Sequence, residues 1–185
     1  SELPMLSTSL LSTDEARRLF FHMSIVQALF GGLVAGKMGE GIIAGLLKSG
    51  AYSPEQARAY EIIEDRVKYI SKTYKVECLS DVKKAVAFAD ISIIAVKPAD
   101  VAKVLEQIAP AMKTGKILLS IAAGVTLDFY RKHLPKHVPI IRVMPNMAVL
   151  VREGMITVCP SAKVPKHQLR RAPEMLKLLG RRPTL

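Results

Sequence analysis

Short apolar runs alternate with amphipathic segments along the chain from residue 33 onward. This alternation is typical of a parallel sheet wound with helices, because strands buried on both faces read as nearly continuous apolar runs. The predicted strands lie around Leu33 and at residues 58–62, 76–78, 91–96, 117–121, 140–144 and 155–159. The predicted helices lie at residues 38–49, 65–74, 81–89, 98–108, 127–133 and 166–179. We therefore expect an α/β fold with a doubly wound, mainly parallel sheet and helices on both faces.

Residues that favour helix ends flank several of these segments. Ser80 can cap one helix, and Pro98 suits the first turn of another. Gly50 follows a third helix, at a position where a left-handed backbone is common. The local residue types therefore agree with the pattern of strands and helices.

The segment before residue 34 has two interpretations. Residues 12–15, Ser-Thr-Asp-Glu, can cap a helix whose apolar side chains recur at helical spacing between residues 19 and 30. The competing interpretation is a strand over residues 28–34, interrupted by Gly31-Gly32, which weaken strands. We prefer a strand that ends at Val34. Residues 1–23 are then an N-terminal extension, and residues 24–185 form one domain.

The composition agrees with a single globular domain. The chain has 185 residues, of which 50% are hydrophobic, and a formal net charge of +11. This length and apolar content can form a substantial core and exclude a chain that is disordered throughout. Cys78 and Cys159 are too few for a disulfide framework or a paired zinc site, which fits a reducing compartment.

Much of the positive charge lies in residues 163–185, which hold seven Lys and Arg against a single acid, Glu174. Nucleic-acid binding would require interleaved aromatic residues or a helix-turn-helix pattern, and neither is present. We interpret this segment as a solvated helix face and expect no nucleic-acid partner. No apolar run approaches the roughly 18 residues of a membrane span, and the early acidic residues do not fit a secretory signal. We therefore expect no membrane partner and a cytoplasmic location.

A glycine-rich segment follows the first predicted strand. A dinucleotide-binding loop uses its glycines for a sharp turn, for close approach to a diphosphate and for packing of the helix on the strand. Gly36 and Gly39 suit the second and third of these roles, whereas Val34 occupies the first, where a branched side chain is unfavourable. Residues 39–44 match the glycine pattern formally, but they continue an amphipathic helix. Glycines between a strand and a helix can also be purely structural.

Glu61 stands 22 residues after Gly39, at the end of the next predicted strand. An acidic side chain at this place can accept a hydrogen bond from a ribose hydroxyl of the cofactor. Arg58 and Arg66 lie nearby and can instead pair with a ribose 2′-phosphate. These residues leave the choice between NAD and NADP open.

Six short motifs, taken together, resemble the pyrroline-5-carboxylate reductase family. They cover residues 36–40, 45–50, 95–98, 120–126, 142–146 and 153–155, among them Ala-Val-Lys-Pro and Arg-Val-Met-Pro-Asn. Their order and spacing match the family from about residue 33 to residue 179. The resemblance implies a Rossmann-like cofactor domain, which in the family precedes an all-helical domain that dimerises and forms much of the substrate site. We expect that helical domain to be absent from this chain.

The resemblance also implies the roles of individual residues. The expected diphosphate-binding residues are Leu33, Val34, Ala35, Gly36, Lys37, Met38 and Gly39. The residues expected along the ribose and nicotinamide are Ala95, Val96, Lys97, Pro98, Ala122, Ala123 and Gly124. Lys97 can balance phosphate charge or simply face water, and Asn146 can orient the nicotinamide or the substrate or simply form a turn. The chain departs from the family pattern at Val34 and at Val82, where many members carry Asn, although Asp81 is adjacent.

The reaction implied by the resemblance is hydride transfer from NAD(P)H to the C=N bond of 1-pyrroline-5-carboxylate, which gives L-proline. The resemblance slightly favours NADPH and implies a small-molecule substrate and a homo-oligomer for the full-length protein. We name no catalytic residue and expect no metal, because the four histidines are scattered and suit surface positions. The alternatives are a non-catalytic dinucleotide-binding or interaction module and a related imine reductase.

Overall fold

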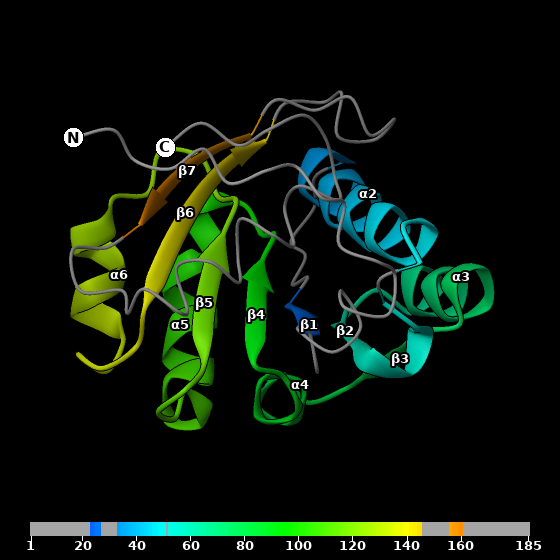
Figure 1. The fold of residues 1–185 in the computed structure, drawn as a ribbon, viewed down its shortest axis with the longest axis horizontal. Helices are drawn as coiled ribbons and strands as arrows, with labels where there is room; N and C mark the ends of the chain where they lie inside the picture. Colours follow the sequence, from blue (N-terminus) through cyan, green and yellow to red (C-terminus); the bar gives the residue numbers. More distant parts are fainter. Residues whose placement is uncertain (1–22, 27–32, 51, 146–155, 161–185) are drawn as a thin grey trace, which may run out of the picture.

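The computed structural model describes residues 23–26, 33–50, 52–145 and 156–160. In these residues a seven-stranded sheet has the strand order β3-β2-β1-β4-β5-β6-β7 (Figure 1). Neighbouring strands are parallel except for β6 and β7, which are antiparallel. The strands are β1 (Met23–Val26), β2 (Ala57–Tyr60), β3 (Glu77–Leu79), β4 (Ile91–Ile94), β5 (Ile117–Ser120), β6 (Ile140–Pro145) and β7 (Ile156–Pro160).

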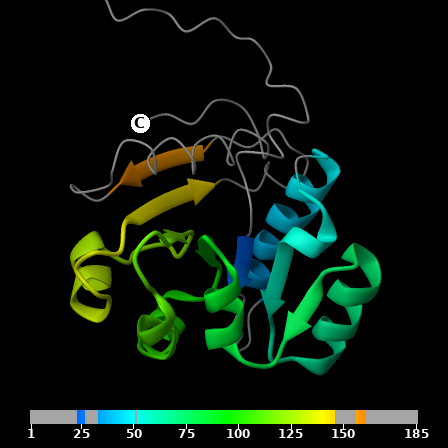
Figure 2. The same ribbon diagram turned by 60° about the horizontal axis from the view of Figure 1, so that its bottom comes forward.

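Helices cover both faces of the sheet (Figures 1 and 2). The α-helices are α2 (Leu33–Lys48), α3 (Glu64–Tyr74), α4 (Val82–Phe88), α5 (Val101–Ile108) and α6 (Leu127–His133). Short 3-10 turns are η1 (Pro54–Gln56), η2 (Pro98–Asp100) and η3 (Ala109–Ala111). Side chains of α2 and α3 pack on one face, and those of α4, α5 and α6 pack on the other. The doubly wound arrangement predicted from the sequence is confirmed.

The core consists of two apolar clusters, one on each face of the sheet. Ile91 and Ile93 of β4 belong to the cluster that includes Ile42 of α2. Ile94 of the same strand belongs to the other cluster, which includes Leu105 of α5. Successive side chains of a strand point to opposite faces, so both faces of β4 are buried, as are those of β5. This burial explains why both segments read as continuous apolar runs in the sequence.

The strand predicted to end at Val34 is wrong. The first strand is Met23–Val26, and Leu33 begins α2, a few residues before the predicted helix start. The other interpretation, a helix with apolar residues between positions 19 and 30, is also wrong at Met23–Val26. These residues form a strand that pairs in parallel with β2 on one side and β4 on the other. Backbone pairing on two sides outweighs the local helical spacing of apolar residues, and such pairing depends on distant parts of the chain. The remaining residues of both interpretations before Leu33 lie outside the described part.

The other predicted elements agree with the structure to within a few residues. Gly50 follows α2 with a φ of +73°, and Pro98 opens η2 in the first turn, as predicted. The predicted cap of α4 is wrong by one residue, because Asp81 rather than Ser80 precedes the helix and accepts from the N–H of Lys83 at 2.8 Å. The helix predicted over residues 166–179 lies outside the described residues. No helix in the described ranges has the length and hydropathy of a membrane span.

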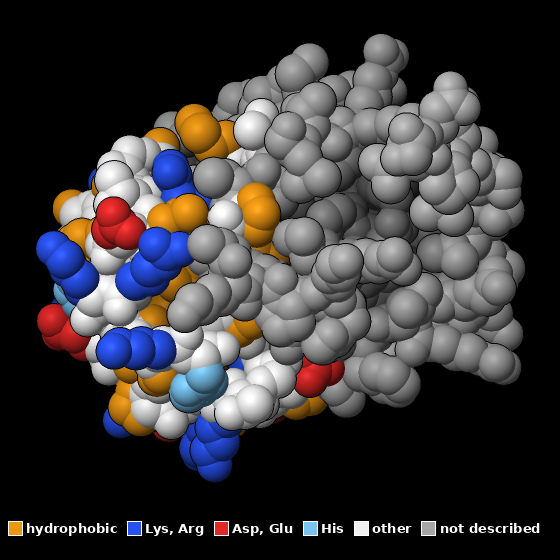
Figure 3. Space-filling view, turned by 60° about the vertical axis from the view of Figure 1, so that its left-hand side comes forward, with side chains coloured by type: hydrophobic (Ala, Val, Ile, Leu, Met, Phe, Trp, Pro, Cys, Tyr) orange, Lys and Arg blue, Asp and Glu red, His pale blue; other side chains and the backbone are white. Residues whose placement is uncertain are grey.

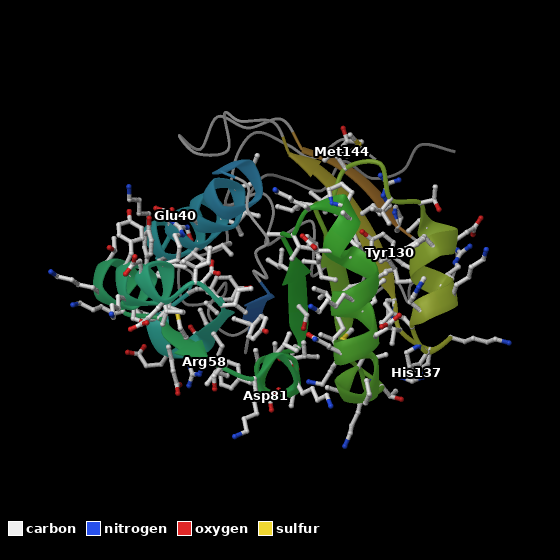
Figure 4. The ribbon with its side chains drawn as sticks, turned by 180° about the vertical axis from the view of Figure 1, so that it is seen from behind. Glu40, Arg58, Asp81, Tyr130, His137 and Met144 are labelled. Carbon is white, nitrogen blue, oxygen red and sulfur yellow. The ribbon has the colours of Figure 1, made fainter. Side chains whose placement is uncertain are left out.

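A charged cluster holds α2 and α3 together. The carboxylate of Glu40 on α2 accepts hydrogen bonds at 2.9 Å from the hydroxyls of Tyr69 and Tyr74 and at 3.0 Å from Arg66 (Figure 4). Partial burial raises the pKa of Glu40, but these three hydrogen bonds and the charge of Arg66 outweigh it and lower the pKa overall. The ionised carboxylate therefore stabilises the contact between the two helices.

We expect Glu40→Ala to lower the free energy of unfolding by about 2 kcal/mol at pH 7, because three donors lose a shared acceptor. The pKa of Glu40 is lower in the folded chain than in the unfolded one, so its contribution is complete above about pH 5. The contribution is lost as the pH falls through the folded pKa, and the stabilities of the two proteins should converge there. Urea unfolding at several pH values measures this. Glu64→Ala removes an exposed pair with Lys68 and should change stability by less than about 0.5 kcal/mol; an equal effect of the two substitutions would contradict the assignment.

Candidate functional site

The carboxyl ends of four neighbouring strands lie in register. Val26, the last residue of β1, pairs with Tyr60 of β2 on one side and with Ile94 of β4 on the other. Ile94 in turn pairs with Ser120, the last residue of β5. The chain leaves β1 toward β2 on one side of the sheet, while β4 lies on the other, so the winding reverses between β1 and β4. Ligands of open α/β sheets bind at the carboxyl ends beside such a reversal.

Helix α2 begins close after β1 in the sequence and contains all the residues expected to bind a diphosphate. Leu33–Met38 and Gly39 form its first turns. The first N–H groups of a helix have no partner within the helix, and together with the helix dipole they favour an anion. Residues 27–32, which connect β1 to α2, lie outside the described residues.

A branched side chain at Val34 is not unfavourable in this structure, although the sequence suggested that it would be. Val34 has a helical conformation, and Lys75 is the single non-glycine residue with a positive φ among those described. Val34 therefore does not form the sharp turn that was expected there. Residues 39–44, the formal match to the glycine pattern, continue the helix as predicted, and Gly41 and Gly45 are both buried.

Glu61 follows β2 directly and is 3% exposed. Its Oε1 accepts from the N–H groups of Ile62 at 2.8 Å and Ile63 at 3.1 Å, whereas its Oε2 is buried without a hydrogen-bond partner in the described part of the chain. Burial raises the pKa of Glu61, and the two backbone hydrogen bonds and the charge of Arg66 oppose this rise. A buried polar atom without a partner is costly, so this oxygen is a candidate acceptor for a ligand hydroxyl.

The two arginines near Glu61 are engaged elsewhere. Arg58 makes an ion pair with Glu77 at 2.7 Å and lies over the ring of Phe88, 4.2 Å from its centroid (Figure 4). Arg66 donates to Glu40 at 3.0 Å. Both side chains therefore fill structural roles that the sequence alone did not reveal.

The segment after β4 places Ala95 and Val96 in buried positions. Lys97 is half-buried, and its carbonyl accepts from the N–H of Asp100 at 3.0 Å, which closes the turn η2. Pro98 is exposed and holds the first position of this turn. The expected contact residues of this segment therefore lie at the same edge of the sheet as Glu61.

The segment after β5 presents an exposed backbone. Ala122 is buried, whereas Ala123 and Gly124 are exposed, and Gly124 has a φ of +73°. The Oγ of Ser120 accepts from the N–H of Ala122 at 3.3 Å and lies 2.6 Å from the hydroxyl of Tyr130. Ser120 is 1% exposed, so this pair holds the start of the loop from inside the core.

Sequence reasoning missed the role of Ser120 and Tyr130. Tyr130 is labelled in Figure 4. Burial raises the pKa of Tyr130, although Ser120 and Arg142 oppose this, and the phenol therefore stays neutral and able to donate. A single hydroxyl within the apolar run of β5 was the available signal for Ser120. No pattern in the sequence indicates Tyr130, because its partner lies in another element.

The remaining positions considered in the sequence are Asn146 and the histidines. Asn146 lies outside the described residues. Met144, near the end of β6 (Figure 4), is 56% exposed. His137 is exposed, as predicted, and its Nε2 lies 3.0 Å from the carbonyl of Met112. His133 is half-buried and stacks on Phe129. Among the described residues no cluster of His, Cys, Asp and Glu suits a metal ion.

Charge is mixed on the face that carries α6. Figure 3 shows Lys and Arg side chains there with acidic and apolar ones among them. Arg131 and Asp128 of α6 form one exposed pair at 3.1 Å. The basic segment 163–185 lies outside the described residues, and the expectation of no nucleic-acid partner stays a prediction.

Three features of the described edge suit a dinucleotide. The first N–H groups of α2 favour an anion, such as a diphosphate. Glu61 carries a buried carboxylate oxygen that has no hydrogen-bond partner among the described residues and suits a ribose hydroxyl. The loop after β5 supplies exposed backbone near Ala123 and Gly124, where a flat ring can approach closely.

Comparisons with known proteins agree with this geometry. A family model described as NADP oxidoreductase, coenzyme F420-dependent, matches residues 30–124. The pyrroline-5-carboxylate reductase of Escherichia coli (strain K12) is 37% identical over 129 residues, which are 70% of this chain and 48% of that relative. The chain spans about half the length of the curated relatives it matches.

Solved structures have the same fold. The pyrroline-5-carboxylate reductase of Coxiella burnetii has a TM-score of 0.79 at 25% identity, over 89% of this chain and 58% of that one. The pyrroline carboxylate reductase of Plasmodium falciparum, solved with NADP bound, has a TM-score of 0.76 at 21% identity, over 89% of this chain and 56% of that one. The predicted Rossmann-like α/β fold is confirmed.

A double-mutant cycle tests the Ser120–Tyr130 pair. Ser120→Ala leaves the buried Tyr130 hydroxyl without its partner and should lower the free energy of unfolding by about 1–3 kcal/mol. Tyr130→Phe removes the same contact from the other side. The double variant should lose less than the sum of the two single variants, because no unpaired hydroxyl then remains. Additive losses in urea unfolding would argue against a direct hydrogen bond.

Proposed function

We propose that this chain, which belongs to the pyrroline-5-carboxylate reductase family and matches the family model described as NADP oxidoreductase, coenzyme F420-dependent, is the cofactor domain of an NAD(P)H-dependent reductase. The reaction we propose is reduction of the C=N bond of 1-pyrroline-5-carboxylate to L-proline. The main support from the structure is the row of aligned strand ends beside the buried Oε2 of Glu61, which has no hydrogen-bond partner within the described ranges.

Each residue group has a proposed task. The first turns of α2 bind the diphosphate through Leu33–Met38 and Gly39, and Glu61 accepts from a ribose hydroxyl. Residues 95–98 and 122–124 line the ribose and nicotinamide, and Lys97 balances phosphate charge. When bound, the reduced nicotinamide supplies a hydride to the imine carbon. Asn146 is proposed to orient the nicotinamide or the substrate.

The chain's own residues hold and shield the reacting groups in this proposal. Ala95, Val96 and Ala122 are buried and form an apolar floor at the strand ends, which limits access of water. Ser120 and Tyr130 fix the loop that begins at Ala122, and they are positioning residues. We assign no proton donor among the described residues. A homo-oligomeric full-length protein and a cytoplasmic location stay predictions.

Binding tests the cofactor site directly. Calorimetric titration of the 185-residue chain with NADH and with NADPH should detect binding of at least one of them to a single site. Gly36→Asp places a negative charge in the first turn of α2, which the helix dipole tolerates, but the charge repels a diphosphate. This variant should weaken binding at least tenfold. Lys48→Ala lowers the net charge equally at the far end of α2 and should change binding less than twofold; equal effects, or no binding of either cofactor, would contradict the site.

Turnover separates the proposed reductase from the alternatives. Oxidation of NADH or NADPH with 1-pyrroline-5-carboxylate should yield L-proline, with the Escherichia coli reductase as a positive control. Cofactor binding without turnover by the whole protein would favour a non-catalytic dinucleotide-binding module. Turnover with other cyclic imines but not with 1-pyrroline-5-carboxylate would favour a related imine reductase.

A further inference from the structure

The carboxylate of Glu61 can accept a hydrogen bond from a ligand hydroxyl, but it would repel a negatively charged ligand group. Its Oε1 is already held by two backbone N–H groups, which fix the orientation of the side chain. Its Oε2 is buried and has no hydrogen-bond partner in the described part of the chain. A hydroxyl can donate to this oxygen, whereas a phosphate at pH 7 offers only negatively charged acceptors and would be repelled.

The topology places this carboxylate next to the expected adenosine ribose. Glu61 follows Tyr60, which pairs with Val26 at the end of β1. In wound α/β folds the diphosphate lies after the first strand, and the ribose next to it reaches the end of the adjacent second strand. Ile62 and Ile63 are 46% and 40% exposed, so an adenine ring on this ribose would cover apolar surface.

The described cations near Glu61 are paired with other acidic side chains, so they do not cancel the repulsion between the Glu61 carboxylate and a 2′-phosphate. Arg58 is committed to Glu77 and stacks on Phe88. The field of Arg66 reaches Glu61, but its guanidinium donates to Glu40 at 3.0 Å. Lys68, on the same helix as Arg66, pairs with Glu64 at 2.7 Å. Among the described side chains, a 2′-phosphate beside the Glu61 carboxylate would therefore have the shared charge of Arg66 alone to balance it.

We propose that Glu61 is a specificity-determining residue that makes this chain select a dinucleotide with a free ribose 2′-hydroxyl, NADH over NADPH. The inference rests on the proposed dinucleotide site. The family resemblance slightly favours NADPH, whereas the inference favours NADH. The reason is that one buried acidic side chain decides which ribose substituent fits.

The test compares the affinities of the whole 185-residue chain for NADH and NADPH by calorimetry at one ionic strength. NADH should bind at least tenfold more tightly. Glu61→Ser removes the carboxylate, so a 2′-phosphate would meet the field of Arg66 without an opposing negative charge. NADH should then bind more weakly and NADPH more tightly, and the ratio of their affinities should fall at least tenfold. Glu61→Gln keeps the shape and the acceptor for Ile62 and Ile63, and it should also lower the ratio if Glu61→Ser does not fold.

Glu64→Ser is the matched control, because it removes the same charge from an exposed side chain three residues away. It should leave the NADH to NADPH ratio within twofold of the original. Tighter binding of NADPH by the unaltered chain, or an unchanged ratio in both Glu61 variants, would overturn the inference and leave the proposed site intact. Failure of both cofactors to bind would overturn the inference and the proposed site together.

Discussion

Parallel backbone pairing is the constraint on which the site depends. Hydrogen bonds between neighbouring strands fix which residues stand side by side, and here they place Tyr60, Val26, Ile94 and Ser120 in one row. Four loops therefore leave the sheet at the same level, although they are far apart in the sequence. A shift of one residue in any of these pairings would turn every side chain of that strand to the opposite face. The strand ends that form the proposed site are therefore fixed relative to one another, because the register cannot slip without exposing the core.

Because both faces of the central strands are buried, the proposed site lies at the carboxyl ends of the strands and not on a face of the sheet. Strands β4 and β5 are buried throughout, and their side chains pack against helices on either side. A polar side chain in such a buried strand needs a hydrogen-bond partner. Ser120 pairs with Tyr130 and supports the following loop, which satisfies its hydroxyl inside the core. In the described part of the chain, Oε1 of Glu61 has two hydrogen-bond partners and Oε2 has none, which is the basis for proposing a ligand contact at Glu61 and a structural role for Ser120.

The first strand shows why sequence patterns fail locally. Its four residues, Met23–Val26, lie among apolar residues at helical spacing, and the apolar residues at 28–34 favour a strand instead. Neither interpretation took account of the two neighbours that Met23–Val26 finds in β2 and β4. Val34 illustrates the same point, because a branched residue is unsuitable in a tight turn yet acceptable in the helix where it actually lies.

By itself the sequence determined the α/β class, most strands and helices, and the position of Glu61 after a buried strand. These features follow from period and burial, which each segment records in its own residues. Only the tertiary structure decided that Arg58 pairs with Glu77, that Ser120 contacts Tyr130, and that one oxygen of Glu61 has no hydrogen-bond partner among the residues the structure describes. Each of these depends on which side chains from distant segments meet, and that depends on the register and packing of the whole sheet.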